Sequence, residues 1–500
     1  MSKIKSLILG SAAGLVAIGG AQAADLPVKA KAVEYVKVCS LYGAGFYYIP
    51  GTDTCLRIGG YVRAEYNING VNSDAPALGG VGGAYARTAT MNNTRGRLAI
   101  QFDTRTATEY GVVRAYASFT PQFSTGDVLA NNNVNRFEFA FIQFAGFTFG
   151  RSASAYALPW NAAPGNNLTS TLFGGPNYDA GVWNVQYAWQ FGNGMSLSVG
   201  VDEQSSSNRV GLYSAGTALS ALNSYTNNYN GANGVSGTAG GFNPGGYYGG
   251  GVDIVGNLKL DQAWGLIQVS GAAHQLSSAY YDGTNASSGS ASDKWGYAVN
   301  LGLQLKNLPT GPGDDIKFSI GYTEGALRYI MGNSGPTPSS FALYGGSSST
   351  NIATAPIADG VYGGTSGNTI QLTKGFGLNG GFNHVWNANW SSSVFGSYTQ
   401  VSYNDAAKSV LSAAWAPLTA ARGTVVYNPD FNIGQIGINT AWTPVKGLTF
   451  SGEAMYTNID AKTTGTTGAT FSPGAPRPTG VYTLGSQDVW SGSLRVQRNF

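Results

Sequence analysis

Residues 182–203 read VWNVQYAWQFGNGMSLSVGVDE, and this stretch decides the fold. Large apolar side chains occupy every second position of residues 182–191, and the positions between them include asparagine and glutamine. A period of two predicts a β-strand with one apolar face, because a helix repeats at about 3.6 residues. The turn Gly192-Asn193-Gly194 leads into a second predicted strand over 195–203. The apolar set is Trp183, Val185, Tyr187, Trp189 and Phe191, and the polar set is Asn184, Gln186 and Gln190.

The same alternation recurs along the chain and predicts sixteen strands. A strand that crosses a membrane needs about 9 to 11 residues whose side chains alternate between lipid and lumen. The connections between the predicted strands alternate in length, from Ala145-Gly146 to the long stretches 204–250 and 327–373. Short periplasmic turns and long extracellular loops are typical of an outer-membrane barrel. The predicted strands are 56–70, 94–103, 110–119, 136–144, 147–153, 182–191, 195–203, 251–260, 265–274, 294–305, 316–326, 374–386, 390–399, 431–442, 448–458 and 489–500.

Composition favours the same class of protein. The chain is 43% hydrophobic and only 11% charged, and it contains 73 Gly and 29 Tyr among its 500 residues. A soluble domain carries about a quarter charged residues. Beyond residue 23 no window approaches about 18 uninterrupted apolar residues, so any membrane segments are strands. We therefore expect one all-β domain over 24–500, a transmembrane antiparallel β-barrel. A sandwich or a β-helix has no reason to alternate its connection lengths.

The N-terminal residues predict export, and together with the predicted barrel they predict location in the cell outer membrane. Residues 1–23 have a positive start at Lys3 and Lys5, an apolar stretch, and the small-residue site Ala21-Gln22-Ala23, as in a cleaved secretory signal peptide. A transmembrane anchor is the alternative, but the apolar stretch is short and is interrupted by glycine and serine.

The only two cysteines of the chain are Cys39 and Cys55. An even pair in an exported chain predicts a disulfide formed in the oxidising periplasm, with two free thiols as the alternative. No histidine lies near the pair, which disfavours a metal site. We expect residues 24–55 to form an N-terminal periplasmic segment that contains this bond.

The last predicted strand and the strand ends carry further signals of a barrel. Leu494, Val496 and Phe500 share one parity, which resembles the C-terminal signal read by barrel-insertion machinery, although Arg498 interrupts the stripe. Tryptophans flank several short turns, where an outer-membrane barrel has an aromatic girdle in contact with lipid; packing in a core is the alternative. These tryptophans are Trp264, Trp386, Trp390 and Trp442.

The segment Cys39 to Tyr66, CSLYGAGFYYIPGTDTCLRIGGYVRAEY, resembles the N-terminal signature of the alphaproteobacterial outer-membrane porins, the Brucella and rhizobial family. The mature start Ala24-Asp25-Leu26-Pro27, the segment from Trp160 to Gly181 ending in PNYDAG, and the C-terminus from Leu494 to Phe500 are also similar to that family. The resemblance implies a sixteen-stranded, homotrimeric general diffusion porin, a passive water-filled channel for small hydrophilic solutes. It also implies a third extracellular loop that folds into the lumen.

That third loop corresponds to 154–181 and is the expected constriction loop. In related porins it brings carboxylates opposite a basic wall, and here it supplies only Asp179. The basic side is richer, because several arginines share the lumen parity of the first three strands, beside Glu65. Arginine keeps its charge without a partner, so these residues suggest a weak preference for anions. The alternative is that they pair with Glu65, Asp103 and Glu138 and hold the wall rigid. The arginines are Arg63, Arg95, Arg97 and Arg114.

Other function classes find less support in the sequence. An enzyme with a histidine base has only His274, near a loop end, and His384, on the lipid parity, so we expect no enzyme. We expect no cofactor and no metal site. With a net charge of +3 and no basic block, no nucleic-acid partner is expected. A substrate-specific channel for sugars or anions remains open, as does a structural or adhesive barrel that uses loops 204–250 and 327–373.

Overall fold

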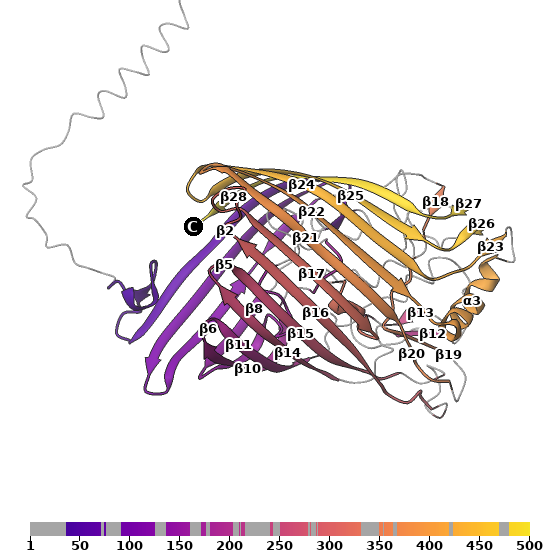
Figure 1. The fold of residues 1–500 in the computed structure, drawn as a ribbon, viewed down its shortest axis with the longest axis horizontal. Coiled ribbons are helices and arrows are strands. Elements are labelled where there is room, and N and C mark those ends of the chain that lie inside the picture. Colours follow the sequence, from indigo (N-terminus) through magenta and orange to yellow (C-terminus); the bar gives the residue numbers. More distant parts are fainter. Residues whose placement is uncertain are drawn as a thin grey trace, which may run out of the picture.

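The chain forms a barrel closed by hydrogen bonds in the computed structural model (Figure 1). Sixteen antiparallel strands follow one another around the ring, and β28 pairs back onto β2 through Tyr61↔Asn499 to Ile68↔Gly492. The structure describes residues 37–71, 75–76, 92–125, 137–160, 172–176, 181–203, 210, 212–215, 241–243, 251–278, 281, 287, 289–331, 350–353, 355–363, 368–419, 424–469 and 480–500.

Each predicted strand is confirmed, mostly with ends shifted by three residues or fewer. The largest difference is at the end of β5, which continues to Thr108. Its outward positions there are Thr104, Thr106 and Thr108 rather than apolar residues, so the apolar alternation stops before the strand does. The barrel strands are β2 (Thr54–Ile68), β5 (Asn93–Thr108), β6 (Gly111–Phe119), β8 (Phe137–Phe144), β9 (Phe147–Ser152), β10 (Val182–Gly192), β11 (Met195–Glu203), β14 (Val252–Gln262), β15 (Gly265–Leu276), β16 (Lys294–Lys306), β17 (Asp315–Glu324), β21 (Lys374–Asn387), β22 (Trp390–Ser402), β24 (Phe431–Val445), β25 (Leu448–Ala461) and β28 (Gln487–Asn499).

Short turns connect neighbouring strands at one end of the barrel, which we call the short-turn end. Asn193 and Gly194 connect β10 to β11 with positive φ angles of 50° and 75°. A Cβ atom at Gly194 would lie 1.9 Å from the carbonyl oxygen of Asp261, so only glycine fits this turn. All connections at the opposite end are longer, and we call it the long-loop end. The predicted alternation of connection lengths is therefore confirmed.

The two faces of each strand differ as the period of two predicts. On β16 the side chains of Trp295, Val299 and Leu301 point outward and are exposed, whereas Asn300 points inward and is buried. Because lipid offers no hydrogen bonds, an apolar outer face and complete backbone pairing are what a membrane barrel requires.

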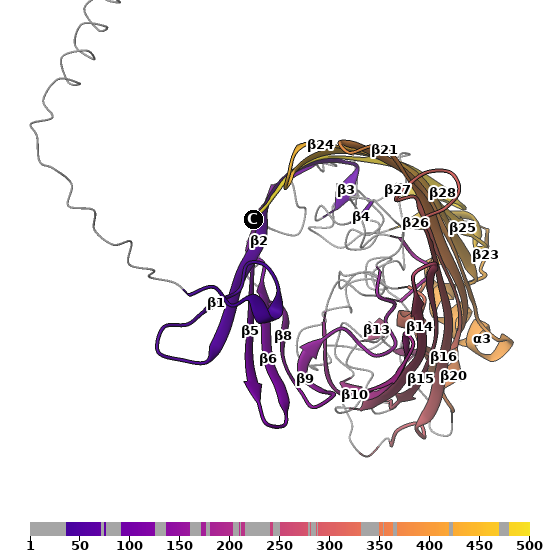
Figure 2. The ribbon, with the colours of Figure 1, turned by 60° about the vertical axis from the view of Figure 1, so that its left-hand side comes forward.

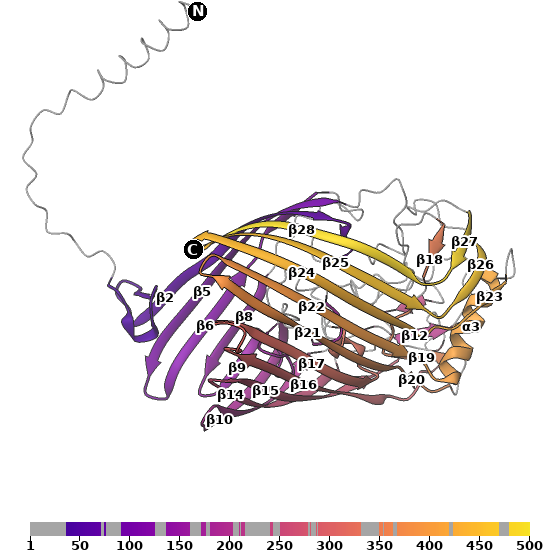
Figure 3. The ribbon, with the colours of Figure 1, turned by 45° about the horizontal axis from the view of Figure 1, so that its top comes forward.

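Segments of the long loops pack together at the long-loop end (Figure 3). Two small sheets and the helix α3 (Asp405–Thr419) lie there, none of which the sequence analysis predicted. No helix in the described residues is long and apolar enough to cross a membrane. One sheet contains β13 (Gly241–Asn243), β12 (Leu212–Ala215), β19 (Gly360–Gly363) and β20 (Gln371–Leu372), and the other contains β18 (Asn351–Ile352), β27 (Gly480–Leu484), β26 (Thr464–Ala469) and β23 (Val425–Val426). The remaining short elements are β1 (Tyr47–Tyr48), β3 (Gly70–Val71), β4 (Ala75–Pro76), β7 (Gln122–Ser124), η2 (Ser40–Tyr42) and η6 (Leu327–Tyr329).

These loop segments share a buried apolar cluster, which we call the loop cap. It brings together Phe173, Tyr213, Met331 and Leu411, which come from four different connections, and it packs them against inward side chains of the barrel such as Ile433. Burial of this many apolar side chains stabilises the loops, since each contributes about 1.5 to 3 kcal/mol on leaving water. The long-loop end therefore has a packed interior of its own.

A buried carboxylate ties the loop cap to the barrel. Asp359 accepts hydrogen bonds from the backbone N–H of Val210, at 2.8 Å, and of Leu327, at 2.6 Å, so it joins two loops. The Asp359 carboxylate also lies 3.6 Å from Nε2 of His274 in β15, and the Nδ1 atom of His274 lies 2.7 Å from Asp253. All three ionisable side chains are fully buried.

Substitution Asp359→Ala leaves two buried N–H groups without their acceptor. We expect it to destabilise the loop cap by about 2 to 3 kcal/mol, while the barrel strands remain paired. Hydrogen exchange should show faster exchange in residues 355–363 and unchanged exchange in β24 and β25. Asp293→Ala, at an exposed position, is the matched control and should leave both regions unchanged. Equal exchange in the two variants would contradict this anchoring role.

Candidate site on the inner wall

The predicted arginines lie on the inward parity of neighbouring strands. The register places Arg63 of β2 directly opposite Arg97 of β5, and Glu65 directly opposite Arg95. On its other side β2 pairs with β28, which places Arg495 opposite Glu65. Like charges in direct cross-strand positions repel, so this part of the wall depends on nearby carboxylates and amides.

Glu65 is the central carboxylate of this wall. It is 5% exposed and accepts hydrogen bonds from Nε of Arg95, at 2.5 Å, and from Nε of Arg495. Arg63 lies farther away, with Nη1 3.9 Å from the Glu65 carboxylate, and donates instead to the side chain of Gln497, at 2.8 Å. One buried carboxylate therefore holds guanidinium groups from both neighbouring strands.

Arg97 contacts one side chain from a short strand and another from a β-bulge. Its guanidinium donates to the side-chain oxygen of Gln122 in β7, at 2.6 and 2.9 Å, and lies 3.4 Å from Glu138. The pairing of β6 with β8 shifts register between Ser118 and Phe119, opposite Glu138, as expected for a β-bulge. This local irregularity brings Glu138 within reach of Arg97.

Arg114 belongs to a second group, nearer the short-turn end. It donates two hydrogen bonds to Asp103, at 2.9 and 3.1 Å, and a third to Gln143. Arg105 also donates twice to Asp103, at 3.3 and 3.0 Å, and Arg57 approaches it at 3.7 Å. The inner wall of β2, β5, β6, β8 and β28 thus brings seven arginines together with the carboxylates Glu65, Asp103 and Glu138 in the described residues, and the net charge of this group is positive.

Sequence reasoning missed Arg105, Arg495 and Gln122. Arg495 has the same inward parity as its predicted neighbours. Pairing the last predicted strand with the first, as a closed barrel requires, would have placed Arg495 next to Glu65. Arg105 lies beyond the predicted end of its strand, and Gln122 lies in a short strand without an apolar alternation. Asp179 lies outside the described residues, as do residues 1–23 and residues 161–171 of loop 154–181.

The described parts of loop 154–181 contact inward side chains of distant strands. The carbonyl oxygens of Ala155 and Ala157 accept hydrogen bonds from Asn257, at 2.5 Å, and from Gln268, at 2.8 Å. The backbone N–H of Phe173 donates to Gln435, at 2.9 Å. Strands β14, β15 and β24 are thus linked to this one loop.

The predicted disulfide is confirmed. Cys39 and Cys55 are bonded and buried, with Cα atoms 6.0 Å apart. Both histidines lie within hydrogen-bonding distance of carboxylates, His274 as described above and His384 with Nδ1 2.7 Å from Asp314. No group of three or more His, Cys, Asp or Glu side chains among the described residues is placed to hold a metal ion.

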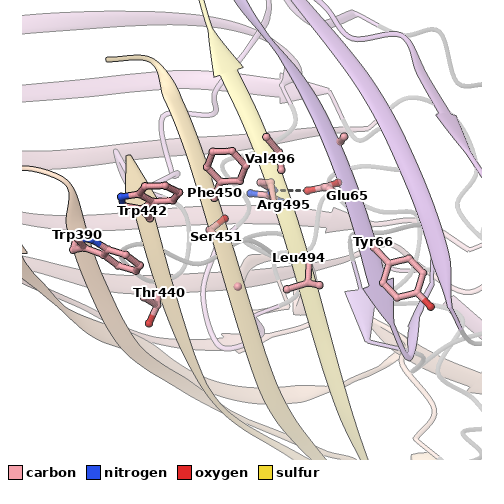
Figure 4. A pocket seen from close by; sticks show the side chains of 12 residues that line it. Glu65, Tyr66, Trp390, Thr440, Trp442, Phe450, Ser451, Leu494, Arg495 and Val496 are labelled. Carbon is pink, nitrogen blue, oxygen red and sulfur yellow. Dashed lines mark hydrogen bonds and ion pairs between the residues drawn. The ribbon is translucent and has the colours of Figure 1, made fainter. Parts of the chain in front are cut away.

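The outward face carries an apolar hollow over β22, β24, β25, β28 and β2 (Figure 4). Trp390 and Trp442 stack with ring centroids 5.8 Å apart, and Phe450 lies beside Trp442. Leu494 and Val496 of the last strand also line it. The hollow faces away from the inner wall, so it belongs to contacts outside the barrel.

A closed sixteen-stranded barrel with an apolar exterior and a charged interior defines an outer-membrane β-barrel protein. The model of the porin subfamily matches residues 25–493, so the chain belongs to this family, as its N-terminal motif suggests. This membership indicates a channel rather than an enzyme, and it places the protein in the outer membrane.

Curated relatives include porins of Brucella. Porin Omp2b of Brucella suis is 33% identical over 273 residues, which cover 53% of this chain and 64% of that porin. Porin Omp2a of Brucella ovis is 35% identical over 220 residues, which cover 40% of this chain and 59% of that porin. The chain thus spans slightly less than two thirds of the length of these relatives. Among solved structures, the outer-membrane channel DcaP of Acinetobacter baumannii has a TM-score of 0.53 at 16% identity, covering 91% of this chain and 99% of that chain, and it shares the fold.

Substitution Glu65→Gln removes the shared partner of two buried arginines. Loss of one member of a buried ion pair costs about 3 to 5 kcal/mol, because the remaining charges stay out of water. We expect a lower urea midpoint for unfolding of the barrel in detergent micelles. Glu109→Gln, in the exposed turn after β5, should leave the midpoint unchanged. A Glu65→Gln midpoint equal to that of the wild type would show that Glu65 does not hold the wall together.

Asp314, in the turn before β17, should make the stability of the barrel depend on pH. The Asp314 carboxylate accepts hydrogen bonds from the Thr310 hydroxyl and the Val385 N–H, and it lies beside His384. Burial alone would raise the pKa of this carboxyl, but the hydrogen bonds and His384 lower it to about 2, from the ordinary 3.8. A lowered pKa stabilises the fold above about pH 4, and this contribution is lost as the pH falls towards 2.

We therefore expect Asp314→Asn to lower the urea midpoint at pH 7 and to lose most of its difference from the wild type at pH 2. Asp53→Asn, in the exposed turn before β2, should match the wild type at both pH values. A difference between Asp314→Asn and the wild type that persists unchanged at pH 2 would contradict the assignment.

Proposed function

We propose that this chain is a general diffusion porin, a passive water-filled channel for small hydrophilic solutes and ions. The observation that carries the proposal is the positively charged inner wall of a closed sixteen-stranded ring. An eight-stranded barrel is filled by its own side chains, whereas a ring of about sixteen strands leaves an aqueous channel. Membership of the porin subfamily supports the same function.

We infer that loop 154–181 folds inward and narrows the channel. The hydrogen bonds of Ala155, Ala157 and Phe173 to inward side chains of β14, β15 and β24, respectively, support this inference. Tyr156 supports it as well, because its ring is buried against Tyr329, with centroids 4.4 Å apart. The inferred constriction then lies between this loop and the arginine wall, with Asp179 as its acidic member.

A weak preference for anions follows from the charge of this wall. Most guanidinium groups share carboxylates, so we propose that the two sequence-based alternatives combine: the ion pairs would hold the wall rigid, and the excess of arginine would leave a positive potential. Among the arginines around Glu65 and Glu138, Arg63 lies farthest from a carboxylate, at 3.9 Å. Arg63, Arg95, Arg97 and Arg114 are the residues we propose to line the channel.

We also propose a homotrimer, as the family implies, with the outward hollow of Figure 4 available for protein or lipid contacts. Trp264, Trp386, Trp390 and Trp442 are exposed beside short turns, where a girdle would contact lipid headgroups.

Leu494, Val496 and Phe500 are exposed on the outward face, accessible to barrel-insertion machinery. Residues 1–23 would be removed on export, leaving 24–55 as a periplasmic segment.

Conductance in a planar bilayer tests the function. Large ohmic steps in threes, unaffected by maltose-like sugars or phosphate, are expected for a general trimeric porin. In a KCl gradient the reversal potential should favour chloride, and Arg63→Gln should reduce that preference by about twofold. Arg498→Gln, on the outward face, is the matched control and should leave selectivity unchanged. Small steps blocked by one solute would replace this proposal with a substrate-specific channel, and absence of conductance would favour a structural barrel.

A further inference from the structure

The disulfide-bonded N-terminal segment, residues 37–55, extends the barrel sheet at the short-turn end (Figure 2). Strand β1 pairs with the first residues of β2, through Tyr47↔Leu56 and Tyr48↔Cys55. The last strand, β28, pairs with β2 from Tyr61 onward, and Phe500, which follows β28, extends this pairing by one residue to Gly60. The segment therefore occupies the edge of β2 that the closing strand does not reach, beside the mouth of the barrel.

This segment places an aromatic ring in contact with two arginines of the wall. The Phe46 ring lies 5.1 Å from the guanidinium carbon of Arg57 and 5.0 Å from that of Arg105. Phe46 is 2% exposed, and the Tyr42 ring adds a third contact, at 5.5 Å from Arg105. Guanidinium groups are attracted to the faces of aromatic rings, so the segment fixes where both charges lie.

The two arginines and Arg114 share a single carboxylate. The register places Arg57 directly opposite Asp103, and Arg105 directly opposite Arg114. The side chain of Asp103 is 2% exposed, whereas those of Arg57, Arg105 and Arg114 are 45%, 27% and 27% exposed. Three guanidinium groups against one carboxylate leave two positive charges in excess, and the solvent reaches the arginines rather than the carboxylate.

The cluster is separate from the inferred constriction. Asp103 and Arg97 are six positions apart along β5, which corresponds to about 20 Å at the rise of an extended strand. Asp103 lies towards the short-turn end, so a solute would meet the two charged groups one after the other. The cluster therefore does not restate the selectivity of the central wall.

We propose that Arg57, Arg105 and Arg114 form a binding site for small divalent oxyanions at the short-turn mouth, with the disulfide-bonded segment as its positioning element. Guanidinium groups present paired donors that match the oxygens of sulfate, phosphate or carboxylate ions. An excess of two positive charges suits a dianion better than a monoanion. The proposal deepens the proposed function and rests on it, because a site at the mouth acts on permeating ions only if the barrel conducts them.

The test compares the affinity of the purified full-length porin for sulfate with its affinity for methanesulfonate, a monoanion of similar shape. Isothermal titration calorimetry in detergent should show sulfate binding that methanesulfonate does not match. Arg57→Gln is the informative variant, because Arg57 has the longest ion pair of the three and its loss leaves Asp103 with two partners. We expect Arg57→Gln to weaken sulfate binding by about tenfold, as for loss of a hydrogen bond to a charged group.

Two further variants distinguish binding at a specific site from attraction by the overall positive charge of the lumen. Lys317 is an inward residue of the distant strand β17, near the same end of the barrel. Lys317→Gln removes one positive charge there, and its sulfate affinity should stay within about twofold of the wild-type value. Phe46→Leu keeps an apolar side chain but removes the ring that both arginines contact, and should weaken binding by about threefold. Equal effects of Arg57→Gln and Lys317→Gln would overturn the site in favour of overall charge.

Conductance distinguishes failure of this inference from failure of the proposed function. Sulfate added at the short-turn side of a bilayer should reduce the chloride current of the wild type more than that of Arg57→Gln. A conducting pore with no calorimetric sulfate binding would overturn the oxyanion site and leave the porin function intact. A barrel that does not conduct would overturn the proposed function, and the inference with it.

Discussion

Every other feature of this molecule depends on the pairing of backbone hydrogen bonds around a closed ring. Lipid offers no partner to an N–H or a carbonyl group, so the first and last strands must join, as they do between Tyr61↔Asn499 and Ile68↔Gly492. Closure fixes the parity of each strand: one face meets lipid and the other meets the interior. It also brings Arg495, near the C-terminus, beside Glu65, near the N-terminus, and so completes the charged wall.

The charged wall and the loop cap occupy different parts of the barrel and follow different physical rules. The wall is built from direct cross-strand neighbours, in which arginines share the buried carboxylates Glu65 and Asp103, and desolvation is offset by several hydrogen bonds to each carboxylate. The loop cap is held by burial of apolar side chains and by Asp359, which joins two loops. Ions would respond to the wall, whereas the cap limits the conformations of the loops.

The strands could be predicted from the sequence because lipid imposes a strict period of two on residues such as Trp183 and Val185. The arginines of the inner wall follow from the same parity, and Cys39 and Cys55 from an even count. The loop cap could not be predicted: Phe173, Tyr213 and Met331 meet only after the barrel has closed, and no local period marks them. Arg105 was missed because threonines replace the apolar residues where β5 leaves the lipid, and Glu138 reaches Arg97 through a bulge that periodicity does not reveal.

The most direct test of the central claim, that water and charge lie on one face of each strand and lipid on the other, is cysteine labelling at adjacent positions. The native cysteines are bonded to each other, so a single introduced thiol reports alone. With the variants Arg63→Cys and Val62→Cys in membranes, a charged, water-soluble thiol reagent should modify position 63 and leave position 62 unmodified. Modification of position 62 in preference to position 63 would contradict the assigned faces, and with them the proposed channel.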